Sequence, residues 1–198
     1  MTYLVLASAS TARRAMLVQA GLEFVCEAAS IDEAALKCSG VASGLGAVDI
    51  AEALARQKAL WVAKRHPGAL VIGADQMLVC GADWFDKPDS VAAARLQLQA
   101  LCGHTHILMS SAVVVRDSEV IWSHSGQARL TMRRFSSVFL EEYLATIGPE
   151  VCDTVGGYRV EGLGVQLFDS VDGDHYVILG LPLLPLLEFL RYQGVLRI

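Results

Sequence analysis

Short apolar segments alternate along this chain with longer segments whose apolar residues recur every three or four positions. The first pattern predicts strands at 2–7, 23–28, 70–79, 104–116 and 119–132, and the second predicts helices at 11–20, 49–66, 89–101, 136–147 and from 181 onward. Segments 165–170 and 176–179 flank a predicted turn at 171–174. The tight turn at 117–118 makes 104–132 a predicted antiparallel hairpin. We therefore expect an α/β fold: residues 1–198 form a single domain in which helices pack on a mixed, partly antiparallel sheet, as two lobes around a cleft.

Capping residues define where the predicted helices begin. Ser10 is the expected N-cap of the first helix, Asp49 with Glu52 fits a capping box for the second, and Asp89 is expected to cap the third. Segment 37–46 is rich in Gly and Ser, so we expect a mobile loop there.

Asp75 is notable because it interrupts a strongly apolar strand. Leu70–Ile72 precede it and Met77–Val79 follow it, so its carboxylate needs a cation, a metal or several hydrogen-bond donors nearby. Lys87 lies on extended backbone, because the ring of Pro88 excludes its predecessor from the helical region, and it could face the same cleft. The alternative is that Asp75 caps a turn and that Lys87 is solvated.

A second candidate site is the turn between the first strand and the first helix. Ser8 and Ser10 supply hydroxyl groups, and Arg13 and Arg14 add two positive charges where the helix dipole is already positive. Hydroxyls, backbone N–H groups and guanidinium groups together can bind a phosphate. The alternative is that both arginines are solvated.

Three further features are candidates for the site. Asp32 and Glu33 are adjacent acids after the second strand; in extended chain only one of them can face the cleft, where it could bind a metal. Lys58 borders the apolar face of its helix, so its ammonium can point inward or extend to solvent. His104 and His106 share a face at strand spacing, but with no third ligand in view sheet pairing is preferred over a metal site.

Composition narrows the class of partner. A chain of 198 residues with 54% hydrophobic residues can bury a large core, and its net charge of −5 argues against binding a nucleic acid polymer. A small anionic ligand is more compatible with this net charge than a polymeric anion is. The five scattered cysteines indicate neither a disulfide framework nor a zinc site. Neither a membrane span nor an export signal is predicted, so a cytoplasmic protein is expected.

Several motifs, in this order, resemble the Maf-like nucleotide pyrophosphatases, a family related in fold to the inosine triphosphate pyrophosphatases. They span nearly the whole chain and comprise Leu6–Arg14, Asp32-Glu33, Leu54–Ala59, Gly73–Gln76, Lys87-Pro88, Gly103–His106 and Gly180–Leu183. The resemblance implies an elongated sheet with a cleft between two lobes, and hydrolysis of a nucleoside triphosphate to the monophosphate and pyrophosphate. It also implies a divalent cation, Mg²⁺ or Mn²⁺, and a homodimer.

The resemblance assigns roles to the residues already singled out. These roles are phosphate binding by Ser8, Ser10 and Arg13, metal binding by Glu33 and Asp75, proton acceptance by Asp75, and charge neutralisation at the reacting phosphoryl group by Lys58 and Lys87.

The chain departs from the family pattern at positions that bear on which nucleotide base the enzyme would prefer. Many members carry Ser-Pro-Arg-Arg in the first motif, whereas Thr11 and Ala12 stand before Arg13 here, so an arginine or aromatic residue commonly used in substrate choice is missing. Several members have Lys where Thr154 stands. Gln76 and Glu161 resemble the branch that acts on 7-methylguanosine nucleotides, and a carboxylate, which only accepts hydrogen bonds, suits the N–H groups of guanine.

We therefore expect a house-cleaning pyrophosphatase for non-canonical or modified nucleotides such as 7-methyl-GTP. One alternative is a nucleotide-sensing regulator of septum formation with little turnover. Another is a different phosphate-handling enzyme, such as a phosphatase or a sugar-phosphate hydrolase.

Overall fold

The protein, seen in a computed structural model that describes residues 3–197, divides into two compact units. Of the described residues, 3–76, 109–126 and 174–197 form the first unit, and 77–108 and 127–173 form the second. Strands β3 (Leu70–Cys80), β5 (Thr105–Arg116) and β6 (Glu119–Met132) contribute residues to both units. The expected cleft between two lobes stays a prediction.

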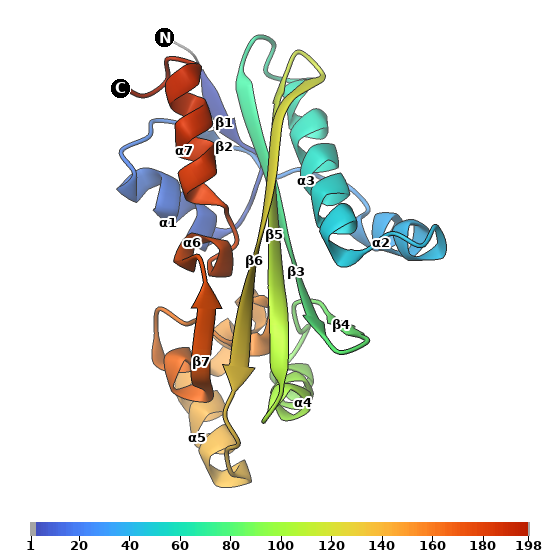
Figure 1. Cartoon of the computed structure of the whole chain (residues 1–198), viewed down its shortest axis with the longest axis vertical. Helices are drawn as coiled ribbons and strands as arrows, with labels where there is room; N and C mark the ends of the chain where they lie inside the picture. The colour runs from blue at the N-terminus through green and yellow to red at the C-terminus, as the bar shows by residue number, and fades with distance from the viewer. Residues whose placement is uncertain (1–2, 198) are drawn as a thin grey trace. The chain divides into compact units, whose positions relative to one another are not determined.

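Seven strands form one mixed sheet (Figure 1). Its order is β2 (Val25–Cys26), β1 (Leu4–Leu6), β3, β5, β6 and β7 (Phe168–Gly173), and β4 (Asp83–Phe85) pairs with β3. β1 is parallel to both β2 and β3, whereas the pairs β3–β4 and β6–β7 are antiparallel. The predicted α/β fold with a mixed, partly antiparallel sheet is confirmed, as are the long neighbouring strands β5 and β6.

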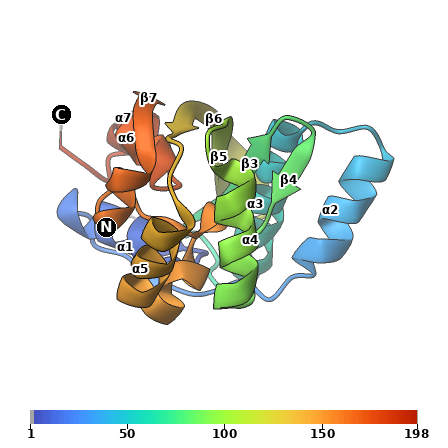
Figure 2. The same ribbon diagram turned by 90° about the horizontal axis from the view of Figure 1, so that it is seen from below.

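In the first unit, helices cover both faces of the sheet (Figure 1). On one side lie α1 (Thr11–Gln19), α6 (His175–Ile178) and α7 (Leu183–Tyr192), and on the other lie α2 (Glu33–Ala42) and α3 (Ala47–Ala63). Seen from below in Figure 2, α2 lies beyond α3, at the margin of this unit. The sheet is therefore the central layer of the first unit.

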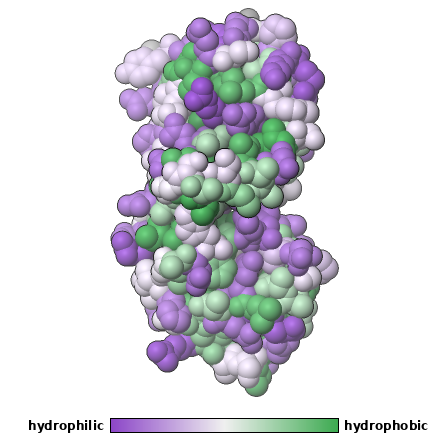
Figure 3. All heavy atoms as spheres, turned by 90° about the vertical axis from the view of Figure 1, so that its right-hand side faces the viewer, coloured by the Kyte–Doolittle hydropathy of each residue, from purple (hydrophilic) through white to green (hydrophobic). Residues whose placement is uncertain are grey.

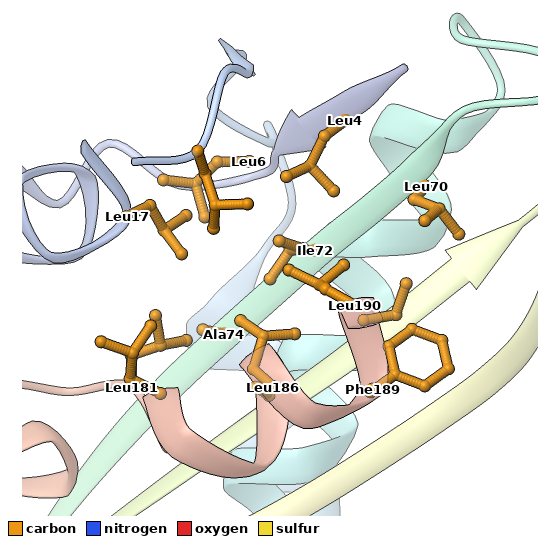
Figure 4. Close-up of a cluster of buried hydrophobic side chains, with 14 of the residues drawn as sticks. Leu4, Leu6, Leu17, Leu70, Ile72, Ala74, Leu181, Leu186, Phe189 and Leu190 are labelled. Carbon is orange, nitrogen blue, oxygen red and sulfur yellow. The ribbon is translucent and has the colours of Figure 1, made fainter. Parts of the chain in front are cut away.

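Consecutive residues of β1 and β3 point into different core clusters, because side chains alternate across a strand. One cluster joins the strands to α1 and α7 (Figure 4), and its members include Leu4, Leu6, Leu70, Ile72, Ala74, Leu181 and Leu186. The other joins Val5 and Val71 to Ala55, Ala59, Val62 and Ala63 of α3. By the same alternation, Asp75 follows Val71 and Gly73 on the side of α3.

The second unit packs two helices and three short 3₁₀ segments against its strands. The helices are α4 (Val91–Leu101) and α5 (Ser137–Ile147), and the 3₁₀ segments are η1 (Gly148–Asp153), η2 (Val155–Gly157) and η3 (Leu163–Leu167). α4 packs on α5, η1 and η2, and Arg95 of α4 forms a bidentate ion pair with Glu141 of α5.

Three local predictions were wrong. The loop expected at 37–46 is confined to 43–46, because α2 continues to Ala42 and is stabilised by packing on α3. Asp49 is the third residue of α3 rather than its N-cap, and its carboxylate accepts a hydrogen bond from the backbone N–H of Gly46. The N-cap of α4 is Ser90 and not Asp89.

The region after η3 also differs from the prediction. β7 runs through most of the expected turn at 171–174, and residues 176–178 lie in the short helix α6. Asp174 caps that helix by accepting hydrogen bonds from the backbone of Tyr176 and Val177. The N-cap expected at Ser10 is confirmed, and Ser136 is the N-cap of α5.

The surface carries hydrophobic and hydrophilic residues side by side. Figure 3 shows them intermixed on the face that it presents. None of the helices within residues 3–197 is long and apolar enough to cross a membrane.

Candidate active site

Lys58 is the centre of a buried cluster of charges in the first unit. Its Nζ lies 2.6 Å from Oδ1 of Asp75 and 3.0 Å from Oε1 of Glu33. Lys58 and Asp75 are 9% and 6% exposed, whereas the Glu33 side chain is 44% exposed. The cation that the buried Asp75 requires is therefore Lys58, and the pair opens to solvent on the Glu33 side.

Close contact between α3 and β3 brings Lys58 to Asp75. A Cβ atom placed on Gly73 would lie 2.0 Å from the carbonyl oxygen of Ala55 and 2.9 Å from the Cβ of Ala59. Because no side chain fits there, glycine allows the helix to lie directly on the strand. Lys58 comes three residues after Ala55 on α3, and Asp75 comes two residues after Gly73 on the same face of β3.

Glu33 reaches Lys58 from the first turn of α2. Asp32 is the N-cap of this helix, and its Oδ1 accepts a hydrogen bond of 2.9 Å from the backbone N–H of Ala35. The sequence-based picture of two acids on extended backbone was wrong, because Glu33 already belongs to the helix. Only one of the two acids meets the site, as expected, but the other is used as a cap.

Ser8 and Ser10 organise the turn between β1 and α1. The Oγ of Ser8 accepts hydrogen bonds from the backbone N–H of Ser10 and from Nη1 of Arg13, each 3.2 Å long. Ser10 caps α1 by accepting from the backbone N–H of Arg13 at 3.3 Å. Since Ser8 acts as an acceptor in both contacts, its own hydroxyl hydrogen can be donated to a ligand.

Arg13 links this turn to the strand that carries Asp75. Its Nη1 donates to the carbonyl oxygen of Ala74 at 2.9 Å, and its Nε donates to that of Gly180 at 2.8 Å. Burial lowers the pKa of the Arg13 guanidinium, and the negative charges of Asp75 and Glu33 oppose that shift. Arg13 therefore connects the turn of Ser8 and Ser10 to the strand of Asp75 within the first unit.

Arg14 is exposed to solvent, whereas the side chain of Gln76 is held by hydrogen bonds to the protein. Arg14 is exposed on α1, away from the buried side of that helix. The Nε2 of Gln76 donates to Oγ of Ser110 and to the carbonyl oxygens of Val177 and Ile178, at 3.0 to 3.1 Å. Its amide hydrogens are thus directed at the protein, which leaves Oε1 as an acceptor for a ligand.

Ser110 was missed in the sequence. It is fully buried in β5, where its Oγ donates to the carbonyl oxygen of Val177 at 2.7 Å. The available signal was the pair Ser110-Ser111 inside an otherwise apolar strand, because buried hydroxyls require partners.

Lys87 and Glu161 belong to the second unit. Lys87 is exposed in the segment between β4 and α4. Glu161 is also exposed, and it lines a cavity of about 280 Å³ together with Tyr143, Tyr158 and Arg159. Their roles stay predictions.

The two histidines considered as metal ligands do not form a metal site. His106 is fully buried in β5, with its Nε2 2.6 Å from the hydroxyl of Tyr158, whereas His104 is exposed. Within the described part of the chain, no three His, Cys, Asp or Glu residues gather in a group that could hold a metal ion.

Comparison with known proteins covers nearly the whole chain. The family model described as "Maf-like protein" matches residues 3–193. A "nucleoside triphosphate pyrophosphatase" of Paramagnetospirillum magneticum is 54% identical, over 96% of this chain and 98% of that protein. A "7-methyl-GTP pyrophosphatase" of Mesorhizobium japonicum is 46% identical, over 98% of this chain and 97% of that protein.

Among solved structures, a nucleoside-triphosphatase (dITP/XTP pyrophosphatase) from Mycobacterium abscessus aligns with a TM-score of 0.45 at 15% identity. The alignment covers 98% of this chain and 96% of that one.

Proposed function

The chain belongs to the Maf-like protein family, and we propose that it hydrolyses a nucleoside triphosphate to the nucleoside monophosphate and pyrophosphate. The observation that carries this proposal is the Lys58–Asp75–Glu33 cluster, joined through Arg13 to the hydroxyl-lined start of α1. Phosphate-binding groups and a buried carboxylate next to cations are what cleavage of a phosphoanhydride requires.

The phosphates bind at the start of α1 in this proposal. Ser8 donates its hydroxyl hydrogen, and the positive end of the α1 dipole and the Arg13 charge attract the anion. Ser10 fixes the geometry of the first helical turn. Arg14, exposed on the same helix, adds positive charge on the approach of the substrate.

A divalent cation fits the donor set of the site. Mg²⁺ and Mn²⁺ prefer hard oxygen ligands and are commonly bound by one or two carboxylates together with substrate phosphates. Glu33 and Asp75 supply two carboxylates that converge within 3.0 Å of one point, the Lys58 ammonium. They would hold the metal, which when bound neutralises charge on the phosphates.

Asp75 is the proposed proton acceptor of the reaction. It takes a proton from the water molecule that attacks the α-phosphorus, the bond from that phosphorus to the bridging oxygen breaks, and pyrophosphate leaves. Lys58 and Lys87 neutralise the negative charge that develops on the phosphoryl oxygens. A positioned base of this kind contributes about 10²- to 10⁴-fold to a rate.

Acceptor groups favour a guanine-type base, and 7-methyl-GTP is our proposed preferred substrate. Gln76 presents Oε1 while its Nε2 is held by the protein, and Glu161 presents a carboxylate. Both can accept hydrogen bonds from the N–H groups of guanine. The name of the Mesorhizobium japonicum relative supports this choice.

We also propose that the protein acts in the cytoplasm as a homodimer, on nucleotides rather than on a nucleic acid polymer. The net charge of −5 disfavours a polymeric anion. The size of the protein in solution, measured by light scattering after gel filtration, tests the dimer.

Pyrophosphate release from a panel of nucleoside triphosphates tests the reaction itself. The panel includes GTP, 7-methyl-GTP, UTP and dTTP with Mg²⁺ or Mn²⁺, and Asp75→Asn is expected to lower kcat by about 100-fold or more. Asp32→Asn is the matched control, because asparagine also caps helices and Asp32 does not contact Lys58. Release of orthophosphate in place of pyrophosphate, or nucleotide binding without any turnover, would refute the proposal.

A further inference from the structure

Lys58 lies in the place that a metal between Glu33 and Asp75 would have to share. Its Nζ is 2.6 Å from Oδ1 of Asp75 and 3.0 Å from Oε1 of Glu33. A metal bound to the same two oxygens, at about 2.1 Å from each, would come close to the ammonium. Two cations at such a distance repel each other strongly in a partly buried site.

We propose that Lys58 is an internal counter-ion that keeps the divalent metal out of the free protein, so that the metal enters together with the nucleotide as a metal–nucleotide complex. This inference rests on the proposed function. It extends that function by naming the complex, rather than the free nucleotide, as the substrate.

Because it is buried, Lys58 competes effectively with a metal ion for the carboxylates of Glu33 and Asp75. The residue is 9% exposed and its helix is held against β3 by the contact at Gly73, so the base of its side chain cannot move away. Its ammonium also satisfies Asp75, which is 6% exposed and would otherwise be a buried, unpaired carboxylate. A metal that arrives alone must displace this pairing, and the cluster offers it the two carboxylates of Glu33 and Asp75 in return.

Nucleotide phosphates relieve this competition between Lys58 and the metal. They offer the ammonium new negative partners and offer the metal additional oxygen ligands, so the two cations no longer compete for the same two carboxylates. Binding of metal and binding of nucleotide are therefore positively coupled, and by linkage each raises the affinity for the other by the same factor.

Binding of Mn²⁺ to the purified protein, followed by the electron paramagnetic resonance of free Mn²⁺ and by calorimetry, tests the inference without any turnover. Lys58→Gln is expected to bind Mn²⁺ at least tenfold more tightly than the unmodified protein in the absence of nucleotide. Arg56→Gln is the matched control, because it removes one positive charge from an exposed position of the same helix, and it should bind Mn²⁺ like the unmodified protein.

A second measurement needs no variant. The α,β-methylene analogue of GTP, which cannot be cleaved between the α- and β-phosphates, should raise the affinity of the unmodified protein for Mn²⁺ at least tenfold. In Lys58→Gln this coupling should be smaller. Equal Mn²⁺ affinity with and without the analogue, or a folded Lys58→Gln that binds Mn²⁺ no more tightly, would overturn the inference.

Failure of the inference and failure of the proposed function give different results. If the unmodified protein releases pyrophosphate but binds Mn²⁺ tightly on its own, the function stands and the role of Lys58 as a counter-ion is wrong. If no triphosphate is hydrolysed but Lys58→Gln gains Mn²⁺ affinity, Lys58 still excludes the metal and the proposed reaction is wrong.

Discussion

Buried His106 should make the protein less stable in mild acid. Its side chain is fully buried in the second unit, Nε2 is 2.6 Å from the Tyr158 hydroxyl, and Nδ1 is without a hydrogen-bond partner among the described residues. The rings of Tyr158 and Phe168 pack around it. A protonated imidazole in this place would carry a buried charge and an unsatisfied N–H group.

The magnitude follows from the pKa. Burial lowers the pKa of His106 from 6.5 to about 4 in the folded protein, whereas the unfolded chain keeps the ordinary value. Between these two values the unfolded state binds more protons, so the free energy of unfolding decreases as the pH falls through this window. The full effect is about 3 kcal/mol, of which about 2 kcal/mol should be lost between pH 7 and pH 5.

Urea unfolding at pH 7 and pH 5, followed by far-UV circular dichroism, measures this loss. His106→Gln cannot take up a proton, so the loss of unfolding free energy over this interval should be smaller by about 2 kcal/mol than in the unmodified protein. Tyr158→Phe keeps the burial but removes the hydroxyl, and it should retain the pH dependence. An identical loss in the unmodified protein and in His106→Gln would show that His106 is not the group responsible.

Three other substitutions test the site. Gly73→Ala forces a methyl group against Ala55 and should lower the free energy of unfolding by about 1–3 kcal/mol, measured in urea; unchanged stability would contradict the close packing of α3 on β3. Lys87→Met should lower kcat for pyrophosphate release by about 100-fold with the melting temperature retained, and an unchanged kcat would remove Lys87 from the reaction. Glu161→Gln should lower kcat/KM for 7-methyl-GTP relative to UTP by about tenfold, and an unchanged ratio would exclude base recognition by Glu161.

Local patterns in the sequence were enough to predict most of the helices and strands. Ser10 was recognised as a cap because its hydroxyl precedes a helical pattern. Asp75 was expected to meet a cation, a metal or several donors because its carboxylate interrupts an apolar strand, and it pairs with Lys58. The last helix, expected from residue 181 onward, begins at Leu183. These features depend on a few neighbouring residues, which is why no knowledge of the tertiary structure was required.

The partners of those residues could not be predicted in the same way. The contact of Arg13 with phosphates stays a prediction, and its hydrogen bonds to Ala74 and Gly180, which join segments far apart in the chain, were not predicted. The contact of Gln76 with the base also stays a prediction, and the three acceptors from β5 and α6 that hold its amide nitrogen were not predicted. Such contacts depend on the arrangement of the elements in space, which composition and periodicity do not encode.

Helix α2 shows how glycine can mislead when only local sequence is considered. Gly40 and its serine neighbours suggested a loop, yet Gly40 is buried in the helix, and a Cβ atom there would lie 2.8 Å from the Ile50 side chain of α3. Glycine is thus used here for close helix packing, which outweighs its low helix propensity. Because α2 was not expected, the approach of Glu33 to Lys58 could not be predicted either.

The two close contacts of α3 together explain the geometry of the charged cluster. Gly73 allows β3, which carries Asp75, to lie directly on one side of α3, and Gly40 allows α2, which carries Glu33, to lie directly on another. Lys58 is on the helix that both of them contact, so the packing of α3 places its side chain between the two carboxylates. A side chain added at Gly73 would meet the backbone of α3 and would therefore move Asp75 away from Lys58 without altering either charge, whereas at Gly40 the Ile50 side chain could shift to make room. The geometry of the Lys58–Asp75 pair thus depends on a residue that has no functional group.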